Sequence, residues 1–376
     1  MKSLCETIFL IAGQLISCEK LSDMRLISDN GSAFIDNFNR RETDYVEKTV
    51  NEGFERVVKM HPGKLAVVDK DRKFTYGELD DLTCRLAAQL HAKGIGKEDF
   101  VAILVPRNAY MTVTAWGVIR SGAGFQALDP TYPQDRLNYM VNDSHAKLLI
   151  ADRELRPLLS EYDGDVIYVD EIANLPQRKF NVEVSPADAF TMIYTSGTTG
   201  KPKGCVLENR NLAAFSDNYL YVTKMDENTH MATYASFGFD AGVQDNVCTM
   251  LAGATLYVIP DEIRLDLPKM EEFFIENGIT HTFMTTQIAR MFAMQTKCKT
   301  LKHVITGGEK LVPFTPNDNF TFVNAYGPCE TIAFICSHEV TDNSPIQPIG
   351  VPNPNAKLYV TDKNLRLVPV GGIGEL

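Results

Sequence analysis

From about residue 65 onward, short apolar runs alternate with longer stretches in which apolar residues recur at helical spacing. The run LAVVD (65–69) predicts a strand, Thr75-x-x-Glu78 predicts the capping box of the next helix, and Gly94 predicts the end of that helix. Strands that alternate with helices predict an α/β fold with a largely parallel sheet. Further strands are expected in FVAILVP, FQALD, KLLIAD, AFTMIYTS, HMATYAS, ATLYVIP, THTFM, KHVITG and TFVNAY.

This alternation of strand-like and helix-like segments is absent at both ends of the sequence. Residues 1–50 hold one apolar helical run and then the polar stretch DNGSAFIDNFNRRETDYVEK, which we expect to be an irregular connector. Residues 51–344 are predicted to form the α/β core. Residues 345–376 carry prolines and turn dipeptides between short strands, which predicts a small β unit. Because the sequence stops just after a Gly-Gly-x-Gly turn, we expect this β unit to be truncated.

The apolar run TIFLIAGQLI (7–16) precedes Ser-Cys and resembles a lipoprotein cleavage box. Only Lys2 supplies positive charge before Glu6, and Gln14 interrupts the run, so the pattern favours an amphipathic helix over a signal peptide. No run reaches the ~18 apolar residues that a membrane helix needs, and we expect no membrane partner.

The charge balance narrows the class of ligand. The 376 residues carry a formal charge of −11, which argues against nucleic acid, because phosphate backbones need a basic surface. An anionic ligand must then be held by a local site. The eight cysteines form no Cys-x-x-Cys pair, which favours reduced thiols in the cytoplasm, and the seven histidines show no metal-binding spacing.

A local anion site is predicted in YTSGTTGKPKG (194–204), which follows an apolar strand, where ligands of open α/β sheets bind. Its glycines let the backbone approach phosphate oxygens, its hydroxyls can donate to them, and its lysines add charge. A solvated linker is the alternative, but this composition directly after a buried strand favours phosphate binding. The residues concerned are Thr195, Ser196, Gly197, Thr198, Thr199, Gly200, Lys201, Lys203 and Gly204.

Two better-known nucleotide motifs do not fit. A Walker A loop needs Gly where Thr195 stands and Ser or Thr where Pro202 stands. The segment 122–127 matches the Gly-x-Gly-x-x-Ala pattern of a dinucleotide-binding turn, but it joins a helix to a strand instead of a strand to a helix. Tight packing at a helix end is the favoured role for these glycines.

Together with this loop, several segments resemble, in order, the core motifs of the adenylate-forming superfamily, and specifically the adenylation domain of nonribosomal peptide synthetases. The likeness covers roughly residues 50–376. The pattern LDPxxPxxR and the Asp of FGFDA are similar to the amino-acid branch of the superfamily. The matching segments are FTYGEL (74–79), GAGFQALDPTYPQDR (122–136), YTSGTTGKPKG (194–204), FGFDAGVQD (237–245), NAYGPCET (324–331) and the run that begins PIGVPNPN (348–355).

The resemblance implies an N-terminal core of two mostly parallel sheets flanked by helices, followed by the start of a small β-barrel. It implies that ATP activates an amino acid as aminoacyl-adenylate, with Mg²⁺ on the phosphates. The acyl group would then pass to the phosphopantetheine thiol of a carrier domain. The implied partners are the carrier and condensation domains of the same synthetase, and residues 3–29 resemble the tail of a condensation domain. The family's mobile C-terminal lid lies beyond the sequence, so we expect poor turnover.

The resemblance also implies roles for single residues. The loop hydroxyls of Thr195, Ser196, Thr198 and Thr199 would act in catalysis with Lys203 and Glu330, and Glu330 would hold Mg²⁺. Tyr326 would stack on adenine. Cys329 stands where the family usually has Thr, and a thiol is a weaker donor toward the α-phosphate. The other implied nucleotide-binding residues are Gly197, Gly200, Lys201, Gly307, Gly308, Glu309, Asn324, Ala325 and Gly327.

Asp240 matches the family's Asp that pairs with the α-ammonium of the substrate, and its alternative is a helix N-cap. The implied side-chain pocket is mostly small or apolar and carries no charge, which suits a small or branched aliphatic amino acid. Gln244, the one polar wall, leaves room for proline or a small polar residue. The implied substrate-binding residues are Phe239, Asp240, Ala241, Gln244, Phe283, Ile305, Gly307, Ala325, Ala333 and Phe334.

Two alternatives remain open from the sequence. The first keeps the fold and changes the substrate, as in acyl-CoA or aryl-acid synthetases or a D-alanine–carrier ligase. Asp240 argues against fatty and aryl acids, which have no ammonium group. The second is a non-catalytic nucleotide-binding platform, which Cys329 favours and the intact loop with Glu330 opposes.

Overall fold

The computed structural model describes residues 2–15, 17–20, 24–180, 182–195 and 201–376. The chain splits into two compact units, of which one is Met1–Asp44 with Gly350–Leu376 and the other is Tyr45–Ile349. The predicted division after residues 50 and 344 stays a prediction. The site lies within the larger unit.

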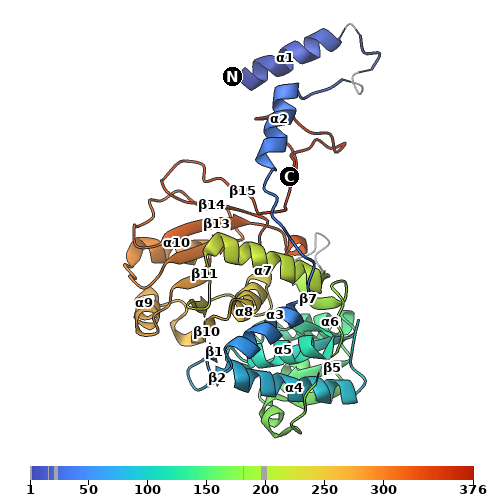
Figure 1. Ribbon diagram of the computed structural model, residues 1–376, viewed down its shortest axis with the longest axis vertical. Coiled ribbons are helices and arrows are strands. Elements are labelled where there is room, and N and C mark those ends of the chain that lie inside the picture. Colours follow the sequence, from blue (N-terminus) through green and yellow to red (C-terminus); the bar gives the residue numbers. More distant parts are fainter. Residues whose placement is uncertain (1, 16, 21–23, 181, 196–200) are drawn as a thin grey trace. The chain divides into compact units, whose positions relative to one another are not determined.

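Helices of the larger unit follow the strands in chain order, as the alternating pattern predicts (Figure 1). The predicted capping box is present, because Thr75 accepts from the Glu78 amide and Glu78 accepts from the Thr75 amide. The helices are α3 Val50–Met60, α4 Tyr76–Ala92, α5 Tyr110–Ser121, α6 Gln134–Asp143, α7 Asn209–Thr223, α8 Asp240–Ala252, α9 Leu267–Glu276 and α10 Thr286–Gln295. Short 3₁₀ turns are η2 Arg156–Leu159, η3 Val169–Asn174, η4 Asp261–Ile263 and η5 Cys329–Thr331.

The first sheet of this unit runs in the order β14-β13-β12-β11-β9-β10-β1-β2. It is parallel from β13 to β1 and antiparallel only at its two edge pairs. Its strands are β1 Leu65–Val68, β2 Lys73–Thr75, β9 His230–Thr233, β10 Thr255–Val258, β11 His281–Thr285, β12 His303–Gly307, β13 Thr321–Tyr326 and β14 Cys336–Glu339.

The second sheet runs in the order β6-β5-β3-β4-β7-β8 and is parallel except for the pair β7–β8. The predicted α/β architecture with two mostly parallel sheets is therefore confirmed. Its strands are β3 Phe100–Leu104, β4 Gly124–Ala127, β5 Leu148–Ala151, β6 Asp165–Tyr168, β7 Ala189–Thr195 and β8 Lys203–Glu208.

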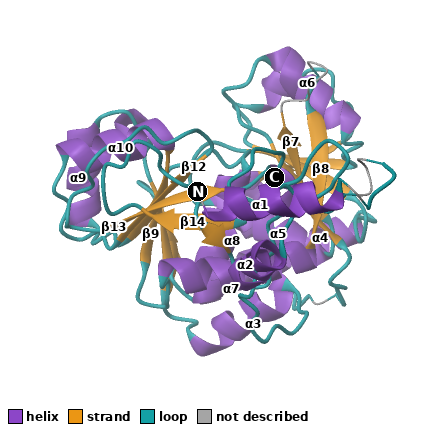
Figure 2. Cartoon of the chain, turned by 90° about the horizontal axis from the view of Figure 1, so that it is seen from above, coloured by secondary structure: helices purple, strands orange, loops and turns teal. Residues whose placement is uncertain are grey.

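Helices cover both faces of each sheet (Figure 2). Helix α8 packs on β9 and β10 of the first sheet, and α5 packs on β3 and β4 of the second. The two helices are joined where the Trp116 indole donates to Asn246 Oδ1 at 3.1 Å, and Phe54 of α3 stacks on Trp116 at 4.3 Å between ring centroids. The largest hydrophobic core is thus built around these helices.

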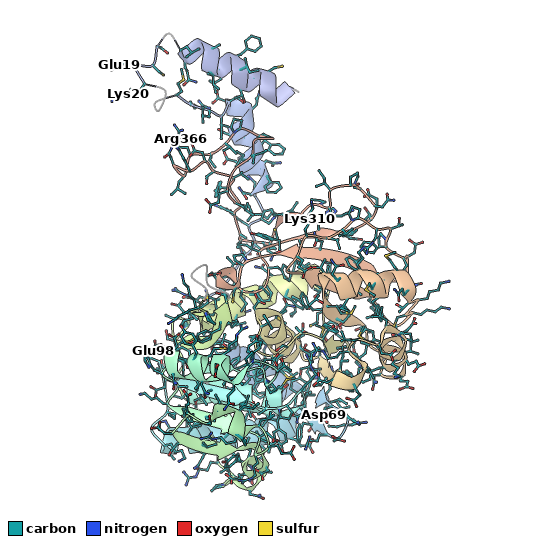
Figure 3. The ribbon with its side chains drawn as sticks, turned by 180° about the vertical axis from the view of Figure 1, so that it is seen from behind. Glu19, Lys20, Asp69, Glu98, Lys310 and Arg366 are labelled. Atoms are coloured by element: carbon teal, nitrogen blue, oxygen red, sulfur yellow. The ribbon has the colours of Figure 1, made fainter. Side chains whose placement is uncertain are left out.

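Two charged side chains fix the loops of this unit (Figure 3). Asp69, after β1, accepts from the Ala109 amide at 2.8 Å and so holds the start of α5. Glu98, before β3, accepts from the Ala189 amide at 3.1 Å and holds the start of β7. Asp69 thus fixes the start of α5, and Glu98 fixes the start of β7, whose other end leads into the phosphate loop.

The smaller unit contains α1 Lys2–Gln14, α2 Asp29–Phe38 and the short β15 Val351–Pro352. The expected N-terminal helix is present, but the expectation of an irregular connector is wrong for residues 29–38. Ser28 caps α2 by accepting from the Gly31 amide at 3.1 Å. This capping serine was not recognised in the sequence because the segment around it is polar. After α2, Asn39 donates to Leu358 O and accepts from its amide. In the described residues, no helix has the length and hydropathy needed to cross a membrane.

Candidate active site

The predicted phosphate loop connects the antiparallel strands β7 and β8, in which Thr195 pairs with Lys203. Ser196, Gly197, Thr198, Thr199 and Gly200 lie outside the described residues. The strand predicted before the loop is present as β7. Interpreting the whole segment as a loop is wrong at its end, because Lys203 and Gly204 already belong to β8.

Helix α6 holds both flanks of this loop. Tyr194 Oη donates to Asp143 Oδ2 at 2.8 Å, and Tyr139 Oη donates to Pro202 O at 3.1 Å. Burial, followed by the contact with Asp143, raises the pKa of Tyr194, so this hydroxyl stays a donor. Lys201 lies over the Tyr139 ring, with its Nζ 6.0 Å from the centroid. Within the described residues neither Lys201 nor Lys203 forms an ion pair, which leaves both charges available for an anion.

Asp240 is the first residue of α8, and the N-cap position belongs to Phe239, which makes no capping hydrogen bond. The alternative of Asp240 as the helix N-cap is therefore wrong. Its Oδ1 accepts from the Ala241 amide at 2.8 Å. Burial raises the pKa of Asp240, the Ala241 and Ala333 amides act to lower it, and Glu330 acts to raise it. No Lys or Arg of the described chain forms an ion pair with this carboxylate.

A cavity of about 450 Å³ opens beside Asp240. It is lined by Gly308 and by five residues that the resemblance assigned to substrate binding, namely Phe239, Asp240, Ala241, Phe283 and Gly307. Residues 128–132, which belong to the second predicted motif, also line it. The structure therefore brings the second and fourth motifs together around one space.

The loop that leads into α8 is tied to the second motif. Ser236 Oγ donates to Asp129 Oδ2, while Asp129 Oδ1 accepts from the amide and hydroxyl of Thr131 at 2.9 and 2.6 Å. A Cβ on Gly242 would lie 2.2 Å from Ser236 O, so only glycine lets α8 approach this loop. The Ser236–Asp129 hydrogen bond and the close approach at Gly242 together position the start of α8, where Asp240 lies.

Arg107 is a cavity residue that sequence reasoning missed. Its guanidinium donates to three successive carbonyls, Thr233 O at 3.0 Å, Tyr234 O at 2.7 Å and Ala235 O. Burial, with the neighbouring Arg264, lowers the pKa of Arg107 to about 10, so it remains a cation at neutral pH. The sequence feature that could have identified Arg107 is its position directly after the predicted strand 100–106.

The fifth motif lies close to β8 and Asp240. The thiols of Cys329 and Cys205 contact each other, which joins η5 to β8. Burial and then the nearby Asp240 carboxylate raise the pKa of Cys329, so it is a neutral thiol that can donate a weak hydrogen bond. Glu330 is exposed and influences the pKa of Asp240, Cys205 and Cys329. The third, fourth and fifth motifs thus meet at one place.

The other residues assigned to nucleotide binding take different positions around the end of the first sheet. Tyr326 ends β13 and is 42% exposed, which leaves its ring face open to stacking. Asn324 is buried, and its amide donates to Pro348 O at 2.9 Å. Gly308 has a φ of 99° and Glu309 is exposed. A Cβ on Gly327 would lie 2.5 Å from Phe334 Cα, so glycine permits a close backbone approach there.

Part of the predicted side-chain pocket lies behind the cavity wall instead of on it. None of these residues lines the cavity. Ile305, Ala325 and Phe334 belong to the main core, Ala333 packs against that core, and Gln244 is fully buried. The sequence could not show which of these residues are exposed to the cavity, because an apolar residue on a pocket wall and one in the core look the same in sequence.

Glu330 has the chemistry expected of a magnesium ligand. Mg²⁺ is held in nucleotide sites by one or two carboxylates together with substrate phosphates. The described residues contain no cluster of three or more His, Cys, Asp or Glu side chains that would hold a metal alone. An exposed carboxylate beside the phosphate-loop strand β8 fits a shared site of this kind, and the ion would neutralise phosphate charge there.

Residues 54–376 match the family model described as AMP-binding enzyme. The chain is 33% identical over 345 residues to bacitracin synthase 1 of Bacillus licheniformis, which covers 91% of this chain and 6% of that protein. It is 36% identical over 339 residues to surfactin synthase subunit 2 of Bacillus subtilis (strain 168), which covers 88% of this chain and 9% of that protein. The chain thus spans less than a tenth of the length of these two curated relatives.

Solved structures share the fold. The nonribosomal peptide synthetase FmoA3 superposes with a TM-score of 0.87 at 20% identity, over 98% of this chain and 42% of that one. The N-terminal subdomain of Klebsiella oxytoca NpsA superposes with a TM-score of 0.78 at 22% identity, over 89% of this chain and 86% of that one. The chain belongs to the AMP-binding enzyme family of adenylating ligases, as an adenylation domain of the nonribosomal peptide synthetase type.

Proposed function

We propose that this chain activates an amino acid with ATP, forming an aminoacyl-adenylate and pyrophosphate, and that the acyl group then passes to a phosphopantetheine thiol on a carrier domain. The apolar walls around Ala241 and Phe283 support a small or branched aliphatic side chain. The proposed partners are the carrier and condensation domains of one synthetase, and the proposed compartment is the cytoplasm. Full turnover is proposed to need a C-terminal lid.

One observation carries this proposal. Asp240 is a carboxylate on the wall of a cavity, and no cation of the described residues pairs with it. A partly desolvated carboxylate is stabilised by a positive partner, and the α-ammonium of an amino acid supplies one. Fatty and aryl acids supply none, which disfavours the acyl-CoA and aryl-acid alternatives.

The proposed reaction follows from what these residues can bind and orient. Asp240 would hold the ammonium group, so that the substrate carboxylate points toward the end of β8 and η5. Lys203 and the loop hydroxyls would hold the phosphates, and Cys329 would donate toward the α-phosphate oxygen. A carboxylate oxygen then attacks the α-phosphorus in line while pyrophosphate leaves. Both reactants are anions, so charge neutralisation and alignment supply most of the rate enhancement.

The test is ATP- and amino-acid-dependent hydroxamate formation with the twenty proteinogenic amino acids, in which hydroxylamine traps the adenylate. Asp240→Asn should abolish hydroxamate formation but preserve thermal stabilisation by ATP, whereas Lys203→Ala and Glu330→Ala should lose that stabilisation. The same assay on a chain extended through the lid separates slow turnover from absence of activity.

Two outcomes would replace the proposal. Hydroxamate formed from fatty or aryl acids, insensitive to Asp240→Asn, would favour an acyl- or aryl-acid synthetase. Stabilisation by ATP without any trapped adenylate, even in the extended chain, would favour the non-catalytic nucleotide-binding platform.

A further inference from the structure

Three buried polar atoms behind the cavity wall have no hydrogen-bond partner among the described residues. They are Gln244 Oε1, Asp245 Oδ2 and Tyr219 Oη. All three side chains have an exposed fraction of 0%. A buried polar group without a partner costs roughly 1–3 kcal/mol, and the great majority of such groups in native proteins are paired. This cluster therefore indicates that a partner is missing.

The cluster lies one helical turn beyond the residues that line the cavity. Asp240 and Ala241, in the first turn of α8, are on the cavity wall. Gln244 follows them by four and three residues, so its side chain leaves the same face of the helix about 6 Å farther along. Ala241 presents only a methyl group on that face. A substrate whose ammonium group meets Asp240 would extend its side chain toward Gln244.

Tyr219 reaches this place from α7. Gln244 lies close enough to Tyr219 to influence the pKa of its hydroxyl, although no hydrogen bond of normal geometry joins the two. The Tyr219 ring also packs against Phe334, with 6.0 Å between the ring centroids. Tyr219 thus contacts two residues that the sequence assigned to the substrate pocket, although nothing in its own sequence context marked it.

Burial disfavours charge in this cluster. Gln244 Nε2 makes a long contact of 3.4 Å with Asp245 Oδ1. Burial raises the pKa of Asp245 well above its ordinary value, while contacts with Thr233 and Gln244 and the charge of Arg107 act to lower it. Gln244 Oε1 can accept a hydrogen bond, and the Tyr219 hydroxyl can both donate and accept one. Burial disfavours a charged substrate side chain here, and a purely apolar one would leave the Gln244 and Tyr219 atoms unpaired.

We propose that Tyr219 and Gln244 bind the side chain of the activated amino acid, and that this side chain ends in a hydroxyl or a carboxamide. The proposal rests on the proposed function, because Asp240 must hold the ammonium group. The substrate side chain would still be small, as expected from the apolar walls, but its terminal group would be polar instead of aliphatic. Threonine, for example, has the shape of valine with a hydroxyl in place of one methyl group.

Sites of this kind discriminate asymmetrically. An apolar pocket rejects an analogue with an added hydroxyl by only about a hundredfold, whereas a site built to hydrogen-bond rejects the analogue that lacks the group by about 10⁴-fold. The direction of preference between two amino acids of equal shape therefore reports which kind of pocket is present.

The experiment compares threonine with valine, and asparagine with leucine, using hydroxamate formation and the binding of the corresponding aminoacyl-sulfamoyl adenosines. We expect the polar member of at least one pair to be preferred by about tenfold or more. Tyr219→Phe, which removes only the hydroxyl, should reduce that ratio by about tenfold and should not lower the melting temperature of the free protein. Tyr221→Phe, on the same helix but 53% exposed, is the matched control and should change neither quantity.

The results that would overturn this inference differ from those that would overturn the proposed function. Preference for valine and leucine overturns this inference and leaves the proposed function intact. The same holds if Tyr219→Phe lowers the melting temperature and leaves the ratio unchanged, because the hydroxyl then serves a buried water or an internal partner. Absence of activation and of analogue binding for every amino acid overturns the proposed function, and this inference with it.

Discussion

Ser236 Oγ donates a hydrogen bond to Asp129 Oδ2 and also accepts one from the Gly238 amide at 3.2 Å. The first contact joins the segment after β4 to the loop that precedes Asp240, and the second lies within that loop. Burial acts to raise the pKa of Asp129, but the hydrogen bonds from Ser236 and Thr131 outweigh it and keep this pKa below its ordinary value.

Ser236→Ala removes both contacts. We expect amino-acid affinity to fall about tenfold, because the loop before Asp240 is released and the Asp129 carboxylate loses a buried donor worth roughly 1–2 kcal/mol. Isothermal titration with an aminoacyl-adenylate analogue measures this. Ser160→Ala, at an exposed position with one hydrogen bond to Gln134, should leave the affinity unchanged. Equal affinity in both variants would show that the Ser236 contacts do not position the loop.

Gly242→Ala tests how closely α8 must approach the same loop. The new Cβ would lie 2.2 Å from Ser236 O and 2.9 Å from Phe237 Cα, both backbone atoms that cannot rotate away. We expect the free energy of unfolding to fall by roughly 1–3 kcal/mol and amino-acid-dependent activity to fall further, since the helix must shift. Chemical denaturation and hydroxamate formation measure the two effects.

Gly63→Ala is the matched control, because a Cβ there would meet nothing within 4 Å. Its free energy of unfolding should stay within about 0.5 kcal/mol of the parent, as for most surface substitutions. A Gly242→Ala protein as stable and as active as Gly63→Ala would contradict the close approach of α8.

His281 makes stability depend on pH. Its Nε2 donates to Thr223 O at 2.9 Å, and its Nδ1 lies 2.9 Å from Thr280 Oγ1, a hydroxyl that can donate to the neutral ring. Burial, aided by His303, lowers the pKa of His281 to about 4. The unfolded chain, with a pKa near 6.5, binds the proton first. Stability is therefore full above pH ~6.5 and is lost as pH falls, by about 3 kcal/mol near pH 4.

Denaturant unfolding between pH 7 and pH 4 measures this loss. His281→Asn should be less stable at pH 7 but should show a shallower decline toward pH 4. His145→Asn, at an exposed site with a φ of 51° that Asn tolerates, should keep the parent's profile. A decline of the same steepness in all three proteins would assign the acid sensitivity to carboxylates elsewhere.

The central strands could be predicted from sequence because strands buried on both faces of a parallel sheet appear as continuous apolar runs. Strands β2, β6, β8 and β14 are more polar and lie at or next to sheet edges, so they lacked this signal. Helix α2 was missed because its composition is polar and its cap is a single serine. The roles given to Asp240 and Glu330 came from the resemblance of their motifs to the family, and these roles stay predictions. Arg107 and Tyr219 were not identifiable from the sequence, because their roles depend on contacts with residues more than 20 positions away.

Cys329→Thr supplies the stronger donor that the fifth motif usually carries. A hydroxyl forms a shorter and stronger hydrogen bond to an anionic oxygen than a thiol does, and the gain of about 1 kcal/mol in the transition state corresponds to a several-fold higher rate. We therefore expect Cys329→Thr to raise the rate of hydroxamate formation several-fold at saturating ATP. Cys298→Ser changes another buried thiol, which contacts Thr300 Oγ1 at 3.2 Å outside the cavity wall, and should leave the rate unchanged. If Cys329→Thr keeps the parent's melting temperature and yet does not raise the rate, the side chain at this position does not donate to the reacting phosphate.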